Sequence, residues 1–371
     1  MMIEDEINKK IADLKKKGVR EYINSEFHFN FDTLKTVKIV VFGINNSIAR
    51  EFVKKQFFFD IIAIIDDYFE QKDFNGIAVL KSDDIVSFEG LYAINLTFSF
   101  PAFRFFNKLA LANAIKMFNY YEITQYYNFQ SDYPYFNNML LETVKNIEQF
   151  FQVITQLEDN LSKNILLKHL YYRLSFNNSV FLDVQEKFEN QYFDIQISDS
   201  DIFVDGGCFD GKTSIELLNR NKNIEKVYCF EPDANNLKKI YKNLQKYSQV
   251  NIMECGLWNK EEELGFLSTS DEISRVVENS DYKIILNTID NLVPDATFIK
   301  LDIEGSEAKA IECTWNTIQK GSPKLAISIY HRPNDLFEIL NLIKLINKNY
   351  HFYIRHYSDF LFDTILYGIV R

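Results

Sequence analysis

The sequence predicts an α/β protein with two doubly wound, Rossmann-like domains joined by a helical segment. Short apolar runs alternate with helix-like stretches in both halves of the 371-residue chain. This pattern is typical of βαβ units around a parallel sheet. Glycine or acidic residues close several of the runs, at the strand ends where open α/β sheets bind ligands. A chain of this length can also bury two separate cores.

Four segments follow one another along the chain. We expect a helical lead over residues 1–35, a Rossmann-like, nucleotide-binding-like domain over 36–130, a helical bridge over 131–195 and a second α/β domain over 196–371. The bridge shows helix patterns at 139–156 and 162–175. His169 lies on an apolar face of the second pattern, where a packed core histidine is more common than a ligand.

In the first domain, apolar runs predict strands at residues 36–42, 60–65, 77–80 and 90–95, with a helix at 47–55. Gly43 closes the first strand, and its turn keeps one glycine where a dinucleotide site uses three. Asp66 follows the second strand, at the position of a ribose-binding carboxylate. Two interpretations stay open: a structural unit, which the missing glycines favour, and a nucleotide or nucleotide-sugar site.

The most informative segment, residues 202–213, reads IFVDGGCFDGKT. An apolar strand ends at Asp205, Gly206 and Gly207 follow, and Gly211 precedes a helix pattern. Glycines in such a turn let a bulky ligand approach the backbone, because they have no Cβ and tolerate unusual φ and ψ angles. This segment therefore predicts a ligand site at a strand–helix corner.

Carboxylates also close the next three predicted strands, at Glu231, at Glu254 and at Asp302 with Glu304. The ends of parallel strands meet at one edge of a sheet, so we expect a single ligand crevice there. Further strands at 324–330, 351–356 and 363–370, the last two as a hairpin, and a helix at 336–347 complete this domain.

The acids around the glycine turn indicate the kind of ligand. Asp205 and Asp210 would repel the pyrophosphate of a dinucleotide, which needs a helix N-terminus open to it. They suit a ligand that carries an ammonium and a sulfonium, and S-adenosylmethionine is such a ligand. Glu231 would accept hydrogen bonds from two ribose hydroxyls.

From about residue 160 to its end, the chain resembles the FkbM family of S-adenosylmethionine-dependent methyltransferases. The resemblance rests on six segments in matching order and spacing, at residues 204–211, 230–233, 256–258, 288–292, 299–307 and 330–336. It implies a class I methyltransferase fold for residues 196–371. Lys212 departs from the family pattern, which has an acidic residue there, and we interpret it as a surface change.

The resemblance implies a role for each matching residue. The methionine end of the donor would lie at the turn of Asp205, Gly206, Gly207 and Gly211, the ribose at Glu231, the adenine at Glu254, Gly256, Leu257 and Trp258, and the methyl group near Asp302 and Glu304. Asp290 has two open roles, of which a turn cap is favoured over a site residue. Residues 271–275 are expected to be a solvated loop, with a lid over the donor as the alternative.

Methyl transfer mainly requires alignment of donor and acceptor, because a sulfonium is already a good leaving group. A hydroxyl acceptor must also lose a proton, and His331 at the end of a strand is the leading candidate base. A structural role for His331 is equally open, and Asp302 or Glu304 are alternative bases. A divalent metal held by Asp302, Glu304 and His331 is chemically possible, but no local spacing favours it, so we expect no metal site.

The overall prediction is an S-adenosylmethionine-dependent O-methyltransferase that methylates a hydroxyl of a sugar, either nucleotide-activated or part of a polysaccharide. The sugar follows from family association and from the first domain. Three alternatives stay open: an N-methyltransferase acting on a small amide or amine, a noncatalytic module that binds S-adenosylmethionine or a nucleotide, and a nicotinamide-dependent oxidoreductase. We expect a small-molecule or sugar substrate, and a homo-oligomer stays open.

Composition excludes several other classes. The formal charge of −11 argues against nonspecific binding to nucleic acid or to anionic membranes. No apolar run is long enough to span a bilayer, and the N-terminus lacks the apolar core of a signal peptide, so we expect a cytoplasmic protein. The four cysteines form no C-x-x-C pair, and buried thiols are their expected state. A catalytic thiol at Cys208 is the alternative.

Overall fold

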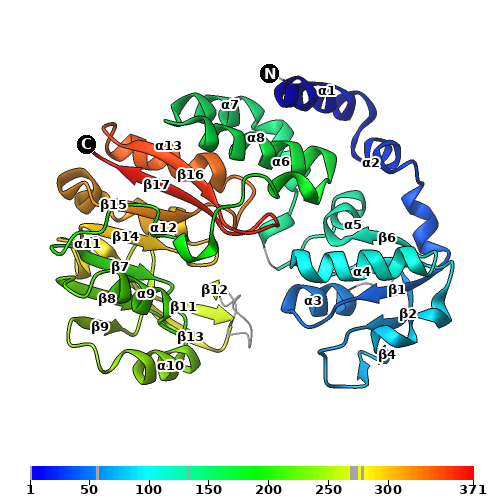
Figure 1. Cartoon of the computed structure of the whole chain (residues 1–371), viewed down its shortest axis with the longest axis horizontal. Helices are drawn as coiled ribbons and strands as arrows, with labels where there is room; N and C mark the ends of the chain where they lie inside the picture. Colours follow the sequence, from blue (N-terminus) through cyan, green and yellow to red (C-terminus); the bar gives the residue numbers. More distant parts are fainter. Residues whose placement is uncertain (1, 56–57, 133, 268–274, 277–279) are drawn as a thin grey trace. The chain divides into compact units, whose positions relative to one another are not determined.

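The computed structural model describes residues 2–55, 58–132, 134–267, 275–276 and 280–371 (Figure 1). The chain divides into two compact units, each formed by two stretches of sequence. Unit 1 comprises Met1–Lys145 and Lys168–Leu182, and unit 2 comprises Asn146–Leu167 and Asp183–Arg371. Within the described residues, no helix is long and apolar enough to cross a membrane.

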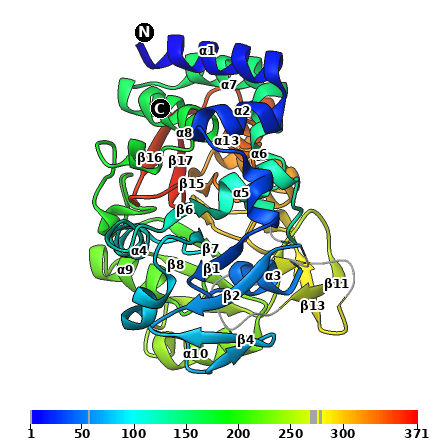
Figure 2. The same ribbon diagram turned by 90° about the vertical axis from the view of Figure 1, so that its right-hand side faces the viewer.

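A six-stranded sheet forms the centre of unit 1, in the order β3-β4-β2-β1-β5-β6 (Figure 2). Its neighbouring strands are parallel except for the β3–β4 pair. The strands are β1 (Lys38–Phe42), β2 (Asp60–Ile65), β3 (Asp73–Phe74), β4 (Ile77–Leu80), β5 (Tyr92–Asn95) and β6 (Lys116–Asn119), and the intervening helices are α3 (Ser47–Lys55), α4 (Phe100–Ala112) and α5 (Tyr120–Tyr127). This is the Rossmann-like alternation that the sequence predicts.

The predicted elements of unit 1 agree with β2, α3 and β4 residue for residue. The sequence pattern missed β6, because Lys116–Asn119 is a short edge strand with only one buried residue, Phe118. Unit 1 also contains α1 (Met2–Lys17), α2 (Val19–Phe27) and α6 (Met139–Lys145), whereas α7 (Ile147–Gln156) belongs to unit 2 and α8 (Asn160–Ser175) is divided between the two units. The predicted helix 139–156 is therefore interrupted at Asn146. His169 is buried against Phe181, with ring centroids 4.7 Å apart.

Unit 2 contains a seven-stranded sheet in the order β16-β17-β15-β14-β7-β8-β9 (Figure 1). Strands β7 (Ile202–Gly206), β8 (Lys226–Phe230), β9 (Val250–Met253), β14 (Phe298–Leu301) and β15 (Lys324–Ser328) are parallel, and β17 (Thr364–Ile369) runs antiparallel to both β15 and β16 (His351–His356). The C-terminal hairpin that the sequence predicts is thus confirmed. The helices that alternate with the strands of unit 2 are α9 (Lys212–Arg220), α10 (Ala234–Leu244), α11 (Ile289–Leu292), α12 (Glu307–Glu312) and α13 (Asp335–Ile346).

A second, smaller sheet in unit 2 has the order β10-β13-β11-β12. Its strands are β10 (Gly256–Leu257), β11 (Glu262–Leu267), β12 (Arg275–Val276) and β13 (Lys283–Asn287). Phe266, Ile284 and Leu286 form its small buried core. The sequence pattern did not predict this sheet, because its strands are short and their exposed positions mix charged residues such as Lys283 with the apolar Ile285.

Asp66 holds the turn that follows β1. The residue is 4% exposed. Its Oδ2 accepts hydrogen bonds from the backbone N–H groups of Ile44 (2.7 Å) and Asn45 (3.0 Å), and its Oδ1 accepts those of Tyr68 (2.9 Å) and Phe69 (3.0 Å). The carboxylate thereby satisfies four backbone donors. This use of both oxygens supports the structural interpretation of Asp66 over ribose binding.

We predict that Asp66→Ala destabilises unit 1 by about 2–4 kcal/mol, because several backbone donors lose a charged acceptor. Differential scanning calorimetry measures the shift in melting temperature. Asp60→Ala, at the exposed first position of the same strand β2, is the matched control and leaves the melting temperature nearly unchanged. Equal shifts in the two variants would contradict the role assigned to Asp66.

Candidate functional site

A cavity of about 530 Å³ lies in unit 2 at the carboxyl ends of β7, β8 and β14. This is the edge where strand order reverses, between β7 and β14, and where open α/β sheets bind ligands. Six of the predicted site residues line it: Gly207, Glu231, Gly256, Leu257, Asp302 and Glu304. The other six do not belong to its described lining: Asp205, Gly206, Gly211, Glu254, Trp258 and His331.

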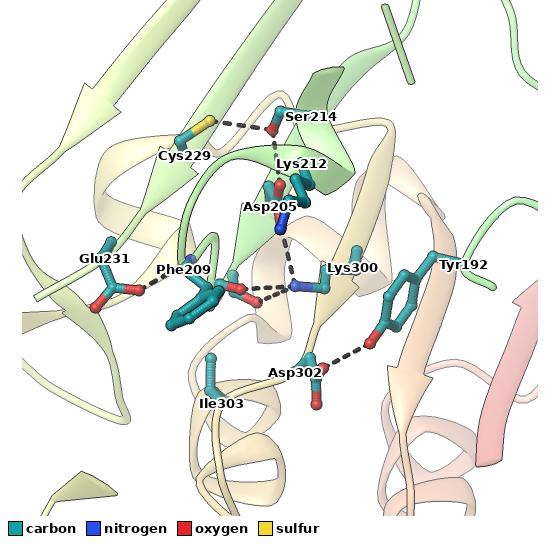
Figure 3. Close-up of polar contacts among 12 residues, drawn as sticks. Tyr192, Asp205, Phe209, Lys212, Ser214, Cys229, Glu231, Lys300, Asp302 and Ile303 are labelled. Carbon is teal, nitrogen blue, oxygen red and sulfur yellow. Dashed lines mark hydrogen bonds and ion pairs between the residues drawn. The ribbon is translucent and has the colours of Figure 1, made fainter. Parts of the chain in front are cut away.

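Asp205 lies beneath the glycine turn and is fully buried. Its Oδ1 lies 3.0 Å from Lys300 Nζ, and its Oδ2 accepts a hydrogen bond of 2.6 Å from Ser214 Oγ, at the start of α9 (Figure 3). Both carboxylate oxygens therefore contact the protein itself. These contacts favour support of the turn as the role of Asp205 over the predicted direct contact with a donor.

Lys300 is a site residue that the sequence analysis missed. Its Nζ donates hydrogen bonds to the backbone oxygens of Gly206 (3.0 Å) and Gly207 (2.9 Å), besides pairing with Asp205 (Figure 3). Burial alone would lower the pKa of Lys300, but Asp205 and Asp302 raise it, so the ammonium stays charged. A lysine inside the apolar run of β14 was the sequence signal, because a buried lysine needs a paired acid.

Gly207 allows the turn after β7 to approach the end of β14 closely. It has a φ of 77°, and a Cβ on it would lie 1.9 Å from the backbone oxygen of Asp302. Gly206 is also confined, because a Cβ there would lie 2.7 Å from the side chain of Leu301. Gly211 has a φ of 84° and precedes α9. Gly206 and Gly211 therefore shape the turn without lining the cavity.

Glu231 follows β8 and faces the cavity. Its Oε2 accepts a hydrogen bond from the backbone N–H of Phe209 (3.0 Å; Figure 3). Its Oε1 accepts one from the backbone N–H of Asp233 (2.9 Å) and a longer one from Asn236 Nδ2 (3.5 Å). Burial raises the pKa of Glu231 to about 7. A carboxylate has about four acceptor positions, so Glu231 keeps the capacity to accept ligand hydroxyls while its orientation is set by the backbone.

The predicted adenine-side residues separate into two groups. Gly256 and Leu257, in β10, line the cavity. Glu254 is exposed outside that lining and accepts a hydrogen bond of 2.6 Å from Tyr241 Oη. Trp258 packs against the small core of the second sheet. Glu254 and Trp258 therefore precede and follow lining residues without belonging to the described lining themselves.

Asp302 is held by two tyrosines that the sequence analysis did not single out. Tyr192 Oη donates a hydrogen bond of 2.5 Å to Oδ2 (Figure 3), and Tyr330 Oη donates one of 3.2 Å to Oδ1. Burial alone would raise the pKa of Asp302, but the charges of His331 and Lys300 outweigh it and lower the pKa. Asp302 is therefore a fixed anion at the centre of the strand edge.

His331 follows β15 and is fully buried. Its Nδ1 lies 2.8 Å from Glu307 Oε1, while its Nε2 lies 3.3 Å from Asp302 Oδ1 and 3.7 Å from Glu304 Oε2. Burial alone would lower the pKa of His331, but these carboxylates raise it to about 10. An imidazolium behind the cavity wall has no lone pair to accept a proton. This geometry argues against the predicted base role and favours positioning of Asp302.

The same residues bear on the metal alternative. Potential ligand atoms of Asp302, Glu307 and His331 lie within 4.8 Å of one another, a set that differs from the predicted one by Glu307 in place of Glu304. Both ring nitrogens of His331 face carboxylates, and the imidazolium supplies the positive charge among them. The carboxylates around His331 are therefore better suited to hold a protonated imidazole than a metal ion.

Other candidate residues have structural roles. Cys208 is buried, and contact with Cys229, together with burial, raises the pKa of its thiol, which disfavours a nucleophilic thiolate. Asp290 accepts hydrogen bonds from the backbone N–H groups of Asn316 and Thr317, which supports a turn-stabilising role. The lid alternative falls on residues 271–275, of which 271–274 lie outside the described part of the chain.

Over 99% of its length, the chain is similar to the crystal structure of the methyltransferase FkbM from Methylobacillus flagellatus KT, of which it covers 99%, with a TM-score of 0.79 and 24% identity. The two chains share a fold. Precorrin-6y C5,15-methyltransferase from Geobacter metallireducens matches 48% of this chain and 83% of its own, at 14% identity and a TM-score of 0.31, too low to establish a shared fold. No protein-family model and no curated protein matches the sequence.

We predict that Gly207→Ala lowers the melting temperature of unit 2 at least twice as far as Gly76→Ala lowers that of unit 1, where Gly76 lies. Both glycines have a φ near 78°, at 77° and 79°, but a Cβ on Gly76 meets nothing within 4 Å. The control therefore carries the left-handed strain, about 1 kcal/mol, without the clash. Differential scanning calorimetry measures the melting temperature of both variants. Equal shifts would show that the close approach of Gly207 to the backbone oxygen of Asp302 does not constrain the turn.

We also predict that Asp205→Asn and Lys300→Met each destabilise unit 2 by about 3–5 kcal/mol, because each leaves a buried charge unpaired. The double variant is expected to recover part of this loss. Both tryptophans of the chain, Trp258 and Trp315, lie in unit 2, so urea unfolding followed by tryptophan fluorescence reports this unit.

The exposed pair of Lys309 and Glu312, 3.0 Å apart, provides the control for that cycle. Lys309→Met should change stability little, because solvent screens the pair. Strictly additive effects of the Asp205 and Lys300 substitutions would show that the two side chains are not coupled.

Proposed function

We propose that this protein is an S-adenosylmethionine-dependent methyltransferase that methylates a hydroxyl group of a sugar. The observation that carries the proposal is Glu231, a buried carboxylate directed into a cavity at the strand edge of a methyltransferase-like fold. Its position after β8, next to the glycine turn after β7, suits the two hydroxyls of a ribose. We assign this activity to unit 2, which contains the predicted methyltransferase segment 196–371 and the cavity-lining residues that precede it.

The charge of the cavity supports a cationic donor. Among the described lining residues, seven are acids and two are lysines: Glu189, Asp210, Glu216, Glu231, Asp302, Glu304 and Asp363 against Lys212 and Lys300. Lys300 is paired with Asp205, and Lys212 lies 2.7 Å from Asp210. The negative potential suits a sulfonium and an ammonium, and it disfavours a pyrophosphate.

The donor would bind along the edge from β8 to β14. Glu231 would hold its ribose, Gly256 and Leu257 would border its adenine, and the turn at Gly207 would face its methionine portion. The bound donor supplies a methyl group on a sulfonium, which needs no further activation. The protein then contributes alignment and exclusion of water.

The excess of acidic residues in the cavity also affects which methyl acceptor it suits. A sugar within a glycan fits the acidic cavity better than a nucleotide-activated sugar, whose diphosphate would face mainly carboxylates. A small amine or amide, as in an N-methyltransferase, is the second candidate that the acidic lining favours. A noncatalytic module that only binds S-adenosylmethionine is the alternative that the assay below addresses.

Unit 1 includes the proposed nucleotide-binding-like segment, residues 36–130. Its one-glycine turn at Gly43 and the occupied carboxylate of Asp66 favour a structural role over binding of a nucleotide or of a nicotinamide cofactor. All four cysteines are free thiols, which suits the reducing cytoplasm where we propose that the protein acts.

We predict that the affinity for S-adenosylmethionine rises with pH up to about 7 and then levels off. The ribose hydroxyls donate to the deprotonated form of Glu231, whose pKa is raised to about 7, so protonation below that pH competes with binding. The loss should approach about tenfold per pH unit below 7. Isothermal titration calorimetry from pH 5.5 to 8.5 measures it.

Glu231→Gln keeps the shape of the side chain and removes the titration. It should bind at least tenfold more weakly at pH 8 and lose the pH dependence. Glu254→Gln, on the exposed neighbouring residue, is the control and should bind normally. An unchanged affinity in Glu231→Gln would refute the ribose assignment.

The methyl acceptor is identified by incubating the protein with a cell extract and isotope-labelled S-adenosylmethionine, followed by mass spectrometry. A labelled sugar would support the proposed function, and a labelled amine would favour N-methylation. Donor binding without any labelled product would favour the noncatalytic module.

A further inference from the structure

We propose that Asp363 is the catalytic residue that accepts the proton of the methyl acceptor, and that Gln191 is its positioning residue. The inference rests on the proposed methyltransferase function and deepens it. It replaces His331, which is buried behind the cavity, with a carboxylate that lines the cavity.

The topology brings Asp363 to the acceptor half of the strand edge. It directly precedes β17, which runs antiparallel to β15 with Ile365 opposite Ser328. The start of β17 therefore lies at the edge where β14 and β15 end. Sheet order places the proposed ribose carboxylate, Glu231 after β8, on one side of Asp302, and Asp363 on the other. An acceptor placed beyond the donor's methyl group would meet this second side.

The side chain of Asp363 is held by hydrogen bonds from neutral side chains, those of Gln191 and Ser358. Gln191 Nε2 donates a hydrogen bond of 3.0 Å to Asp363 Oδ1 and lies 3.1 Å from Tyr192 Oη. The backbone is also held, because Tyr357 N–H donates to the Asp363 carbonyl at 3.0 Å, and Asp363 keeps a left-handed φ of 57°. Gln191 thus links Asp363 to the tyrosine that binds Asp302.

The two carboxylates on this side differ in their capacity to accept a proton. Asp302 receives hydrogen bonds from Tyr192 and Tyr330 and faces the imidazolium of His331. Burial and the negative charge of Asp302 raise the pKa of Asp363 to about 6, against the opposing effects of Gln191, His331 and Ser358. A base with a pKa near the working pH is more effective than a strongly acidic one.

Methyl transfer to the acceptor hydroxyl forms one bond and breaks another. The acceptor oxygen forms the new bond to the methyl carbon, the carbon–sulfur bond breaks, and its electron pair stays on sulfur. Asp363 takes the hydroxyl proton and later releases it to solvent. The sulfonium loses its positive charge when it becomes a thioether, and the carboxylate loses its negative charge when it takes the proton. The net charge is therefore unchanged.

The test compares Asp363→Asn, Asp359→Asn and the unmodified protein. Asp359 lies in the same hairpin but outside the described cavity lining. Calorimetry measures binding of S-adenosylmethionine, and transfer of labelled methyl to a cell extract measures the reaction. We expect Asp363→Asn to bind the donor within about threefold of normal and to transfer methyl at least about 100-fold more slowly, while Asp359→Asn behaves normally.

A second readout does not depend on turnover. In carbon-13 spectra of protein labelled at the aspartate carboxyls, the signal lost in Asp363→Asn should titrate near pH 6. Gln191→Ala should shift that midpoint, and the midpoint of the pH–rate profile, upward, because the donated hydrogen bond favours the anion. If Asp363 had a merely structural role, Gln191→Ala would still shift its titration but would leave the midpoint of the pH–rate profile unchanged.

Each outcome decides the proposal. Transfer by Asp363→Asn at a normal rate would overturn it while leaving the methyltransferase assignment intact. A loss of donor binding of more than tenfold in that variant would make Asp363 a structural residue instead. Donor binding without transfer by the unmodified protein would also overturn it, since a noncatalytic module needs no proton acceptor. Failure of the unmodified protein to bind the donor would refute the proposed function itself.

Discussion

The buried ion pair between Asp205 and Lys300 is the constraint on which the candidate site depends. Its two side chains are 0% and 2% exposed, so neither charge is solvated and each needs the other. Lys300 also binds the carbonyls of Gly206 and Gly207. The pair therefore ties β14 to the turn after β7, and Ser214 extends the tie to α9. The turn keeps its shape because moving it would leave a buried charge unpaired.

Along the strand edge, acidic side chains that lie a short distance apart have different surroundings and therefore different pKa shifts. Burial raises the pKa of Glu231, Asp302 is an anion fixed by two tyrosines and an imidazolium, and burial together with the charge of Asp302 raises the pKa of Asp363. His331 contributes through its charge, because three carboxylates surround it. Burial and neighbouring charge, more than residue type, thus determine the protonation state of each of these groups.

Unit 1 shows that topology alone does not make such a site. It has the same parallel alternation and a glycine at the end of β1. Yet Asp66, at the position of a ribose carboxylate, is occupied by four backbone N–H groups. A Rossmann-like sheet offers an edge for ligands, and the side chains that line the edge determine whether a ligand binds.

The sequence by itself determined the α/β class, most strands of both large sheets, the glycine turn and the carboxylate of Glu231, because periodicity and turn chemistry are local. It did not indicate the second sheet of unit 2, whose short strands have no strong period. Only the tertiary structure decided that Asp205 faces Lys300, that His331 is charged, and that Gln191 meets Asp363 across 172 positions of sequence. The physical reason is that burial, charge pairing and pKa arise from contacts between distant segments, which exist only after the sheet has formed.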